Sequence, residues 1–221
     1  MPWNKKWDDE CHEARIQCVI ASTRAMMQRS PSIGAGYLLT REGVAVFQGN
    51  DAMMTRASGL GRHRKVTFAE VKAVEDFFCE RGGSYSWLSV TSASHSSLEQ
   101  VLQQCGYSAS EPWQIWARAT EDRMSGSALS SVIVRQVPVE DAEVWCRIVA
   151  AGFHGGVPAQ VSPRLVDIFF ALGFAEGSQS FLALLNNEPA GGGVISVQGQ
   201  IASLSTTSVL PQYRRKGCNR P

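Results

Sequence analysis

A basic turn near the end of the chain is the stretch whose residue types and spacing could best perform chemistry. It reads Tyr-Arg-Arg-Lys-Gly at 213–217, and it follows an apolar, β-branched run, 201–210, which stops at Pro211. Backbone N–H groups and cationic side chains can converge on a phosphate at such a turn, and glycine lets the backbone approach closely. The sequence therefore indicates an anion-binding turn, with a solvated end of a strand as the alternative.

The order of residues around this turn resembles the acetyl-CoA-binding segment of the GNAT superfamily of N-acetyltransferases. In that family a strand ending Val-x-Pro precedes (Gln/Arg)-x-x-Gly-x-(Gly/Ala), which opens a long helix. Val209, Pro211, Arg214 and Gly217 match this pattern, whereas Asn219 stands where Gly or Ala is usual. The resemblance is closest over residues 131–219 and looser over residues 1–118.

The resemblance implies transfer of an acetyl group from acetyl-CoA, as co-substrate, to a primary amine of a small molecule or peptide. It also implies that the turn holds the pyrophosphate and that the last strand holds the pantetheine by backbone bonds. The residues at these positions are Thr207, Ser208, Val209, Arg214, Arg215, Lys216, Gly217 and Asn219.

No catalytic residue is assigned from the sequence. Residues 201–210 contain no Asp or Glu that could act as a general base. His154 and Glu176 lie in segments that could face an acceptor, although surface or helix-end roles are the simpler reading. Cys218, beside three cations, could be an activated thiol or an unpartnered one.

The family pattern continues beyond the turn, with a helix whose N-terminus holds the pyrophosphate and a later strand and helix. The given sequence ends at Pro221. We therefore expect an incomplete cofactor site with impaired activity. One face of the last strand and part of the core would lie open, so we also expect low stability or a homodimer. A natural end and a slip of the reading frame are both open, because 218–221 lack the apolar pattern of a helix.

Composition limits the remaining classes of function. The chain has 221 residues, 44% hydrophobic and 19% charged, with a formal net charge of +1, which argues against nucleic-acid or membrane-surface binding. Six scattered cysteines and four scattered histidines show no metal-ligand spacing, so we expect no metal and reduced core thiols. The N-terminus has no apolar signal region and the chain has no run of about 18 apolar residues, so we expect a cytoplasmic protein.

The first half of the sequence predicts a mixture of helices and short strands. We expect a long helix over 11–29, a hairpin from 36–40 and 44–48, and a helix over 68–81 opened by a capping box at Thr67 and Glu70. The first half also predicts a strand over 85–90, a helix opened by a second capping box at Ser96 and Glu99, and a strand over 113–117. The stretch 50–64 is predicted to be a loop. Its glycines at 59 and 61 and the basic residues at 62–65 indicate either a phosphate loop or a solvated basic loop, and it lacks the glycine spacing of the former.

The second half predicts a strand (132–137), two helices (138–153 and 163–172) and three antiparallel strands (180–185, 192–198 and 201–210). This is the order of the front part of a GNAT domain. A polar segment over 120–131 is the predicted linker. We therefore expect an α/β fold of GNAT type, with a degenerate N-terminal half (1–122) in tandem with an incomplete C-terminal half (131–221). The alternative function is a non-catalytic binding or interaction module that keeps the fold.

Overall fold

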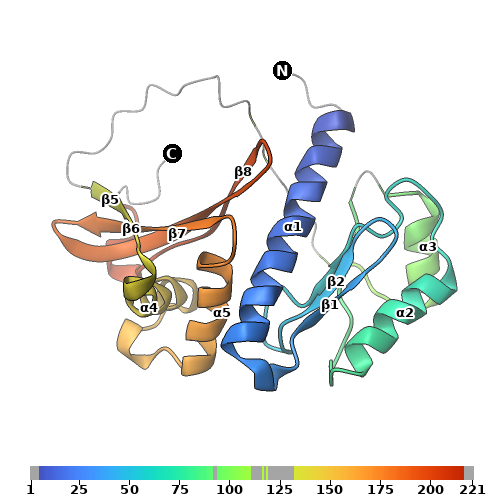
Figure 1. Cartoon of the computed structure of the whole chain (residues 1–221), viewed down its shortest axis with the longest axis horizontal. Helices are drawn as coiled ribbons and strands as arrows, with labels where there is room; N and C mark the ends of the chain where they lie inside the picture. Colours follow the sequence, from blue (N-terminus) through green and yellow to red (C-terminus); the bar gives the residue numbers. More distant parts are fainter. Residues whose placement is uncertain (1–4, 92–93, 111–115, 117, 119–131, 217–221) are drawn as a thin grey trace. The chain divides into compact units, whose positions relative to one another are not determined.

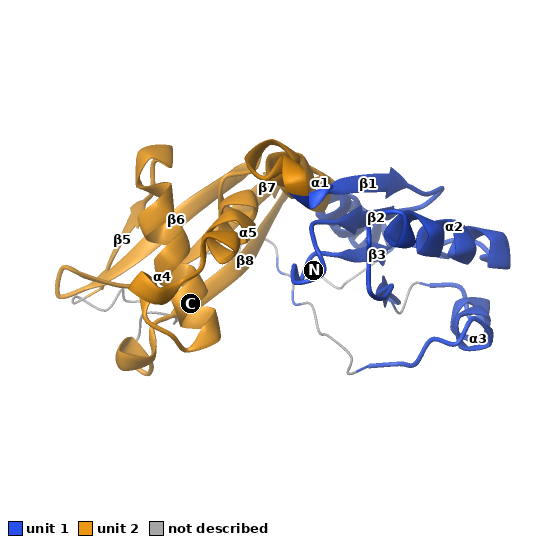
Figure 2. Ribbon diagram, turned by 90° about the horizontal axis from the view of Figure 1, so that it is seen from below, with its two compact units in different colours: residues 1–16, 33–124 blue, residues 17–32, 125–221 orange. Residues whose placement is uncertain are grey.

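The computed structural model describes residues 5–91, 94–110, 116, 118 and 132–216. The chain divides into two compact units (Figure 2): unit 1 comprises residues 1–16 and 33–124, and unit 2 comprises residues 17–32 and 125–221. The long helix α1 (Lys5–Arg29) belongs to unit 1 up to Ile16 and to unit 2 from Gln17. The predicted tandem with limits at 122 and 131 stays a prediction, because the predicted linker lies outside the described residues.

Unit 1 is built on a four-stranded sheet with the strand order β1-β2-β3-β4 (Figure 1). The first two strands form the predicted antiparallel hairpin, with Tyr37 opposite Val46, and the last two strands are parallel. The elements after α1 are β1 (Gly36–Leu39), β2 (Val44–Phe47), β3 (Arg56–Ser58), α2 (Phe68–Cys79), β4 (Leu88–Ser89) and α3 (Ser97–Gln104).

The capping box that opens α2 is confirmed. The Thr67 side chain accepts from the backbone N–H of Glu70, and the Glu70 carboxylate accepts from the backbone N–H of Thr67. This satisfies two of the N–H groups that a helix start leaves without intrahelical partners. The apolar stripe of the helix, which includes Val71 and Phe78, is buried together with Phe47 of the sheet.

Several predictions for unit 1 need correction. The strand β3 lies in the stretch 50–64 that the sequence predicts to be a loop, and the predicted strand over 85–90 is only two residues long. Ser96 precedes α3 but makes no side-chain cap. The predicted strand over 113–117 lies mostly outside the described residues, and Trp116 within it is not in a strand.

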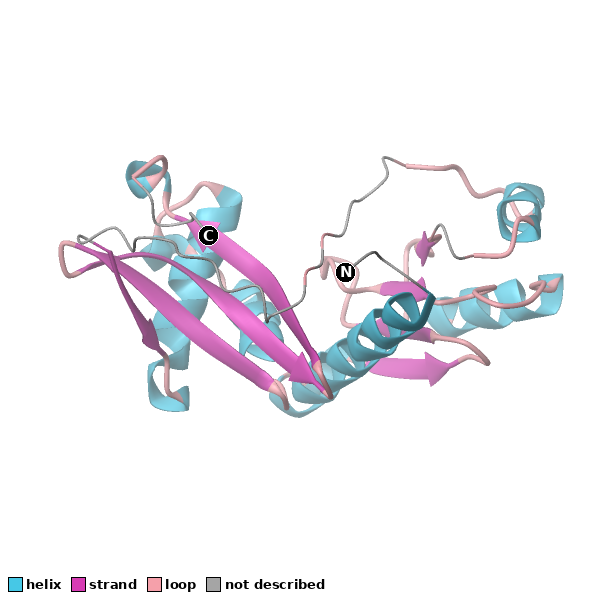
Figure 3. Cartoon of the chain, turned by 90° about the horizontal axis from the view of Figure 1, so that it is seen from above, coloured by secondary structure: helices cyan, strands magenta, loops and turns pink. Residues whose placement is uncertain are grey.

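Unit 2 has a four-stranded antiparallel sheet with the strand order β5-β6-β7-β8 (Figure 3). The predicted sequence of strand, two helices and three antiparallel strands is confirmed, and α4 and α5 lie on the same face of the sheet (Figures 1 and 3). The elements are β5 (Val132–Gln136), α4 (Ala142–His154), α5 (Pro163–Gly173), β6 (Ser178–Leu185), β7 (Glu188–Gln198) and β8 (Ile201–Val209).

The core between these helices and the sheet is centred on Trp145 of α4. Its side chain is fully buried, its indole N–H donates to the carbonyl of Phe181 at 2.9 Å, and its ring meets Phe174 edge-on. Because buried Trp N–H groups need an acceptor, this bond fixes α4 against β6. Val149 and Val194 fill the same core beneath the last two strands. The scaffold under β8 is thus packed and positioned by α4.

Candidate functional site

A β-bulge interrupts the pairing of β7 with β8. Gly192 lies opposite Ser208 and Val194 lies opposite Ser205, so that two residues of β8, Thr206 and Thr207, face one residue of β7. Thr206 has φ of 51°, in the left-handed region that β-branched residues rarely adopt. Bulges and strained residues of this kind concentrate at sites that bind ligands.

The outer edge of β8 has no partner strand among the described residues, because β8 is the last strand of its sheet. The backbone N–H of Leu210 donates inward to the carbonyl of Ala190 at 2.9 Å. Neighbouring residues of a strand direct their backbone groups to opposite edges, so the N–H and C=O of Val209 face outward. No charged residue occurs between Ile201 and Leu210, although exposed strand edges commonly carry charges. This edge can therefore accept an extended ligand by backbone hydrogen bonds.

Close backbone approach holds the bulged strand against α4. A Cβ added to Gly152 would lie 2.5 Å from Ser208 Oγ, and one added to Gly191 would lie 2.3 Å from the carbonyl oxygen of Ser208. The buried Ser208 hydroxyl donates to the carbonyl of Val149 at 2.8 Å. Only glycine fits at these two positions, which lie on either side of β8 next to the bulge.

The turn after β8 is held in place by three sets of contacts. Leu210 is buried in the core, and Pro211–Tyr213 forms a single 3₁₀ turn in which the N–H of Tyr213 donates to the carbonyl of Leu210. The Tyr213 hydroxyl donates to the carboxylate of Glu188 at the start of β7. This bond raises the pKa of Tyr213, because removing the proton would leave two negative groups in contact.

The three cations of the turn have different environments. The Arg214 guanidinium bonds to two backbone carbonyls, those of Val209 at 3.2 Å and Gly152 at 2.8 Å. Arg215 is exposed with φ of 63°, and the Lys216 ammonium lies 5.6 Å from the centre of the Tyr213 ring. Within the described residues, the backbone N–H of Arg215 donates to no carbonyl, whereas the N–H of Lys216 closes the turn over 214–215. Both residues are exposed, so their charges are accessible.

The structure brings together six of the predicted site residues, Thr207 to Val209 and Arg214 to Lys216, at one end of β8. The backbone of this segment faces the free edge at Val209, whereas the side chain of Ser208 faces α4. The Thr207 hydroxyl donates to the carbonyl of Ser205 at 3.2 Å. The predicted site residues Gly217 and Asn219, and Cys218 between them, lie outside the described residues. His154 and Glu176 are both exposed.

Sequence reasoning missed the groups that shape the bulge. The signal was a run of three glycines, 191–193, at the start of a predicted strand. Glycine in a strand weakens the strand unless a bulge or close backbone approach requires it. Gly152, near the end of an apolar helix, carried a similar signal. Thr206 left no trace in the sequence, because its backbone conformation is imposed by the register of the two strands.

The basic loop of unit 1 is solvated only in part: His63 and Lys65 are exposed, whereas Arg62 is buried. Arg62 is only 5% exposed in its side chain and forms ion pairs with Asp8 and Asp9 of α1. His63 lies 3.3 Å from Asp9 through its Nε2. The ion pair with Arg62 lowers the pKa of Asp9. The loop is therefore tied to α1 by its charges, and its arginine is occupied by carboxylates of the same unit.

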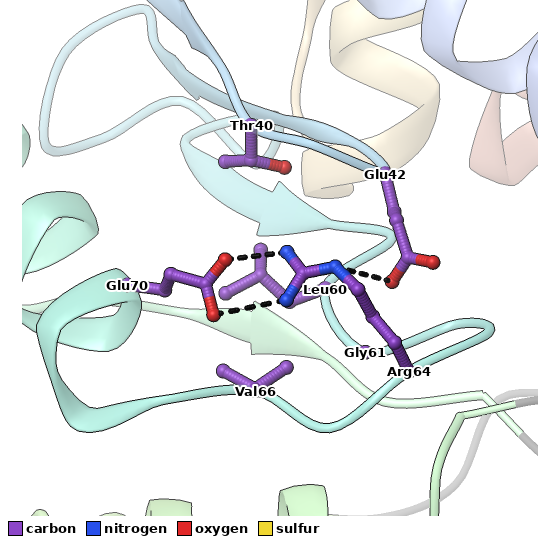
Figure 4. Close-up of a pocket in the computed structure, with 7 residues that line it drawn as sticks. All are labelled: Thr40, Glu42, Leu60, Gly61, Arg64, Val66 and Glu70. Atoms are coloured by element: carbon purple, nitrogen blue, oxygen red, sulfur yellow. Dashed lines mark hydrogen bonds and ion pairs between the residues drawn. The ribbon is translucent and has the colours of Figure 1, made fainter.

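Next to this loop lies a small hollow lined by polar and apolar side chains (Figure 4). Arg64 crosses it, pairing with Glu70 and lying 4.0 Å from Glu42. The hollow has a volume of about 10 Å³, which is about the space that one water molecule needs. The bonds from Arg64 and Thr67 lower the pKa of Glu70 to about 2. The hollow is too small for an organic ligand, and its ion pairs hold the start of α2. Its lining residues are Thr40, Glu42, Leu60, Gly61, Arg64, Val66 and Glu70.

Neither a metal site nor a membrane span is found among the described residues. In the described part of the chain, no three His, Cys, Asp or Glu residues are grouped so that they could hold a metal ion. No helix there is long and apolar enough to cross a membrane. The five described cysteines are free: Cys146 is buried and Cys105 packs against the core of unit 1, whereas the prediction of a core thiol is wrong for the exposed Cys79. Burial raises the pKa of Cys146 to about 12.

Comparisons with known proteins place the fold. No protein-family model matches the chain, and no curated protein matches it in sequence. A solved structure of a GCN5-related N-acetyltransferase from Kribbella flavida aligns with a TM-score of 0.58 at 16% identity, over 90% of this chain and 76% of that one. A functionally unknown conserved protein from Staphylococcus epidermidis aligns with a TM-score of 0.49 at 9% identity, over 84% of this chain and 76% of that one. The predicted resemblance is confirmed at the level of structure: the chain has the mixed α/β fold of the GCN5-related N-acetyltransferases.

Proposed function

We propose that unit 2 binds acetyl-CoA at the bulged end of β8 and transfers the acetyl group to a primary amine. The observation that carries this proposal is the combination of the bulge at Thr206, the outward-facing backbone of Val209 and the exposed basic turn at 215–216. Where such an edge and such a turn are adjacent, an extended chain and a phosphate group can be held side by side. The fold that the chain shares with an acetyltransferase supports the same assignment.

The residues present fit such a ligand. The N–H of Val209 can donate to a pantetheine carbonyl, as the backbone of an added strand would. The N–H of Arg215 can donate to a phosphate oxygen, and the cationic side chains of Arg215 and Lys216 add a favourable field. When bound, acetyl-CoA supplies an activated acetyl group as a thioester.

The described residues include groups that could bind and orient acetyl-CoA, but none that is placed to accept a proton from the amine. β8 contains no carboxylate, and Glu188 near the turn is bonded to Tyr213. The catalytic base therefore stays unassigned. This observation favours the second candidate function, a module that binds the same ligand through the same fold without turnover.

Calorimetric titration with acetyl-CoA tests the proposal. We expect binding that weakens with salt, and about a fivefold loss of affinity on removing either exposed cation, by Arg215→Met or Lys216→Met. Lys65→Met, which removes an exposed cation from unit 1, is the control and should leave the affinity unchanged. Absence of binding at millimolar acetyl-CoA would contradict both candidate functions.

Turnover then separates the two candidates. Release of free CoA thiol in the presence of a panel of primary amines is expected for an enzyme. Tight binding without thiol release from any amine would favour the binding module.

A further inference from the structure

We infer that Arg214 is a positioning residue rather than a phosphate ligand, and that its guanidinium clips the basic turn to both α4 and β8. This inference rests on the proposed function, because it assigns a role within the same site. The family pattern has arginine or glutamine at the position of Arg214. A positive charge so close to the turn would ordinarily be assigned to the phosphate.

The first contact of Arg214 supplies a donor to a backbone carbonyl at the end of α4 that has no partner within the helix. Its Nη2 donates to the carbonyl of Gly152 at 2.8 Å. Gly152 lies in the last turn of α4, where helix carbonyls have no intrahelical donor. A cation here also lies at the negative end of the helix dipole. The charge of Arg214 is therefore directed toward the helix end.

The second contact of Arg214 occupies a backbone acceptor on the open edge of β8. The Nε of Arg214 donates to the carbonyl of Val209 at 3.2 Å. This carbonyl faces the free edge, so its bond to Arg214 removes an acceptor that an added chain would otherwise use. The N–H of Val209 faces the same edge and can still donate a hydrogen bond to a ligand. A ligand that pairs with β8 must therefore leave the edge at Val209, next to the exposed basic turn.

Arg214 is itself exposed, but its guanidinium is bonded to two backbone carbonyls, so the cations of the turn that are left for an anion are those of the next two residues. Tyr213 is held by Glu188, and Arg214 is held by two carbonyls. Arg215, with its left-handed backbone, and Lys216 are the exposed cations that follow. The roles of three consecutive cations are thus divided: one holds the turn, and two meet the anion.

The experiment compares Arg214→Met with Arg214→Lys, and both with Arg215→Met as the matched neighbour. Hydrogen exchange of the peptide covering 209–216 is measured first, without ligand. We expect exchange to speed up about tenfold in Arg214→Met, because two hydrogen bonds to a charged group are lost. Arg214→Lys keeps a charged donor and should restore part of the protection, and Arg215→Met should resemble the wild type. Unchanged exchange in Arg214→Met overturns the inference.

Titration with acetyl-CoA at several salt concentrations gives the second readout. We expect Arg214→Met to lower the affinity about tenfold while leaving its salt dependence as in the wild type, whereas Arg215→Met should reduce the salt dependence. A reduced salt dependence in Arg214→Met would show a phosphate contact and overturn the inference. If the wild type binds no acetyl-CoA, the proposed function fails, and the hydrogen-exchange result alone still decides whether Arg214 is a clip.

Discussion

The close contact between Gly152 and β8 gives the sharpest test of how the site is built. The substitution Gly152→Ala adds one methyl group in the last part of α4. That methyl carbon would lie 2.5 Å from Ser208 Oγ and 2.9 Å from Ser208 Cβ, and both distances are shorter than Cβ atoms tolerate. Either the Ser208 side chain must rotate away or the strand must move outward.

Three contributions set the size of the effect. Overpacking a tight contact costs about 1–3 kcal/mol. Displacing Ser208 from the carbonyl of Val149 costs about 1 kcal/mol more. Replacing glycine by alanine within a helix returns about 1 kcal/mol. The net expectation is a free energy of unfolding lowered by about 1–3 kcal/mol, together with weaker binding of acetyl-CoA, because the displaced strand is the one that carries the bulge.

Urea unfolding followed by circular dichroism measures the loss. Gly156→Ala is the matched control, because no atom lies within 4 Å of a Cβ there, and its stability should change by less than about 0.5 kcal/mol. Ser208→Ala removes the hydroxyl oxygen that is too close, so the double variant should recover about 1 kcal/mol relative to additivity. If Gly152→Ala is as stable as the wild type, or if Ser208→Ala gives no recovery, the proposed packing of α4 on β8 is wrong.

Two further predictions concern titratable groups. The pKa of Glu70 is lowered in the folded state from its ordinary value near 4.5 to about 2, so its ion pair with Arg64 should stabilise the protein fully above pH 4.5 and lose that effect as the pH falls toward 2. Glu70→Gln should therefore lower the urea midpoint of unfolding at pH 7. The difference in midpoint between this variant and the wild type should be smaller at pH 3, and a difference that does not change with pH would contradict this. Burial raises the pKa of Cys146 to about 12, so iodoacetamide at pH 8 should modify the exposed Cys79 and leave Cys146 unmodified. Mass spectrometry of the peptides checks it, and equal labelling of both would refute the buried position of Cys146.

Much of the fold followed from local patterns in the sequence. The capping box at Thr67, the apolar stripe of α2 and the order of elements in unit 2 were all predicted, because each depends on residues close together in the chain. The strand β3 was missed. It contains only three residues, Arg56–Ser58, and it exists because two other strands pair with it.

The candidate site was predicted in position but not in detail. The basic turn and the last strand are adjacent in sequence, so the pattern alone identified them. The division of roles among the cations was not predictable, because it depends on the carbonyl of Gly152, which lies 62 positions away in the chain. Likewise Arg62, which the sequence placed in an open loop, is buried by acids of α1 53 and 54 positions away.

The most direct test of the central claim is hydrogen exchange with and without CoA, mapped along the whole chain. We expect CoA to slow exchange in peptides covering β8 and the following turn, with the largest effect between Thr206 and Lys216. We expect no effect on the hairpin of β1 and β2 in unit 1. Protection confined to unit 1, or no protection at a CoA concentration that saturates binding, would contradict the assignment of the bulged strand and its basic turn as the ligand site.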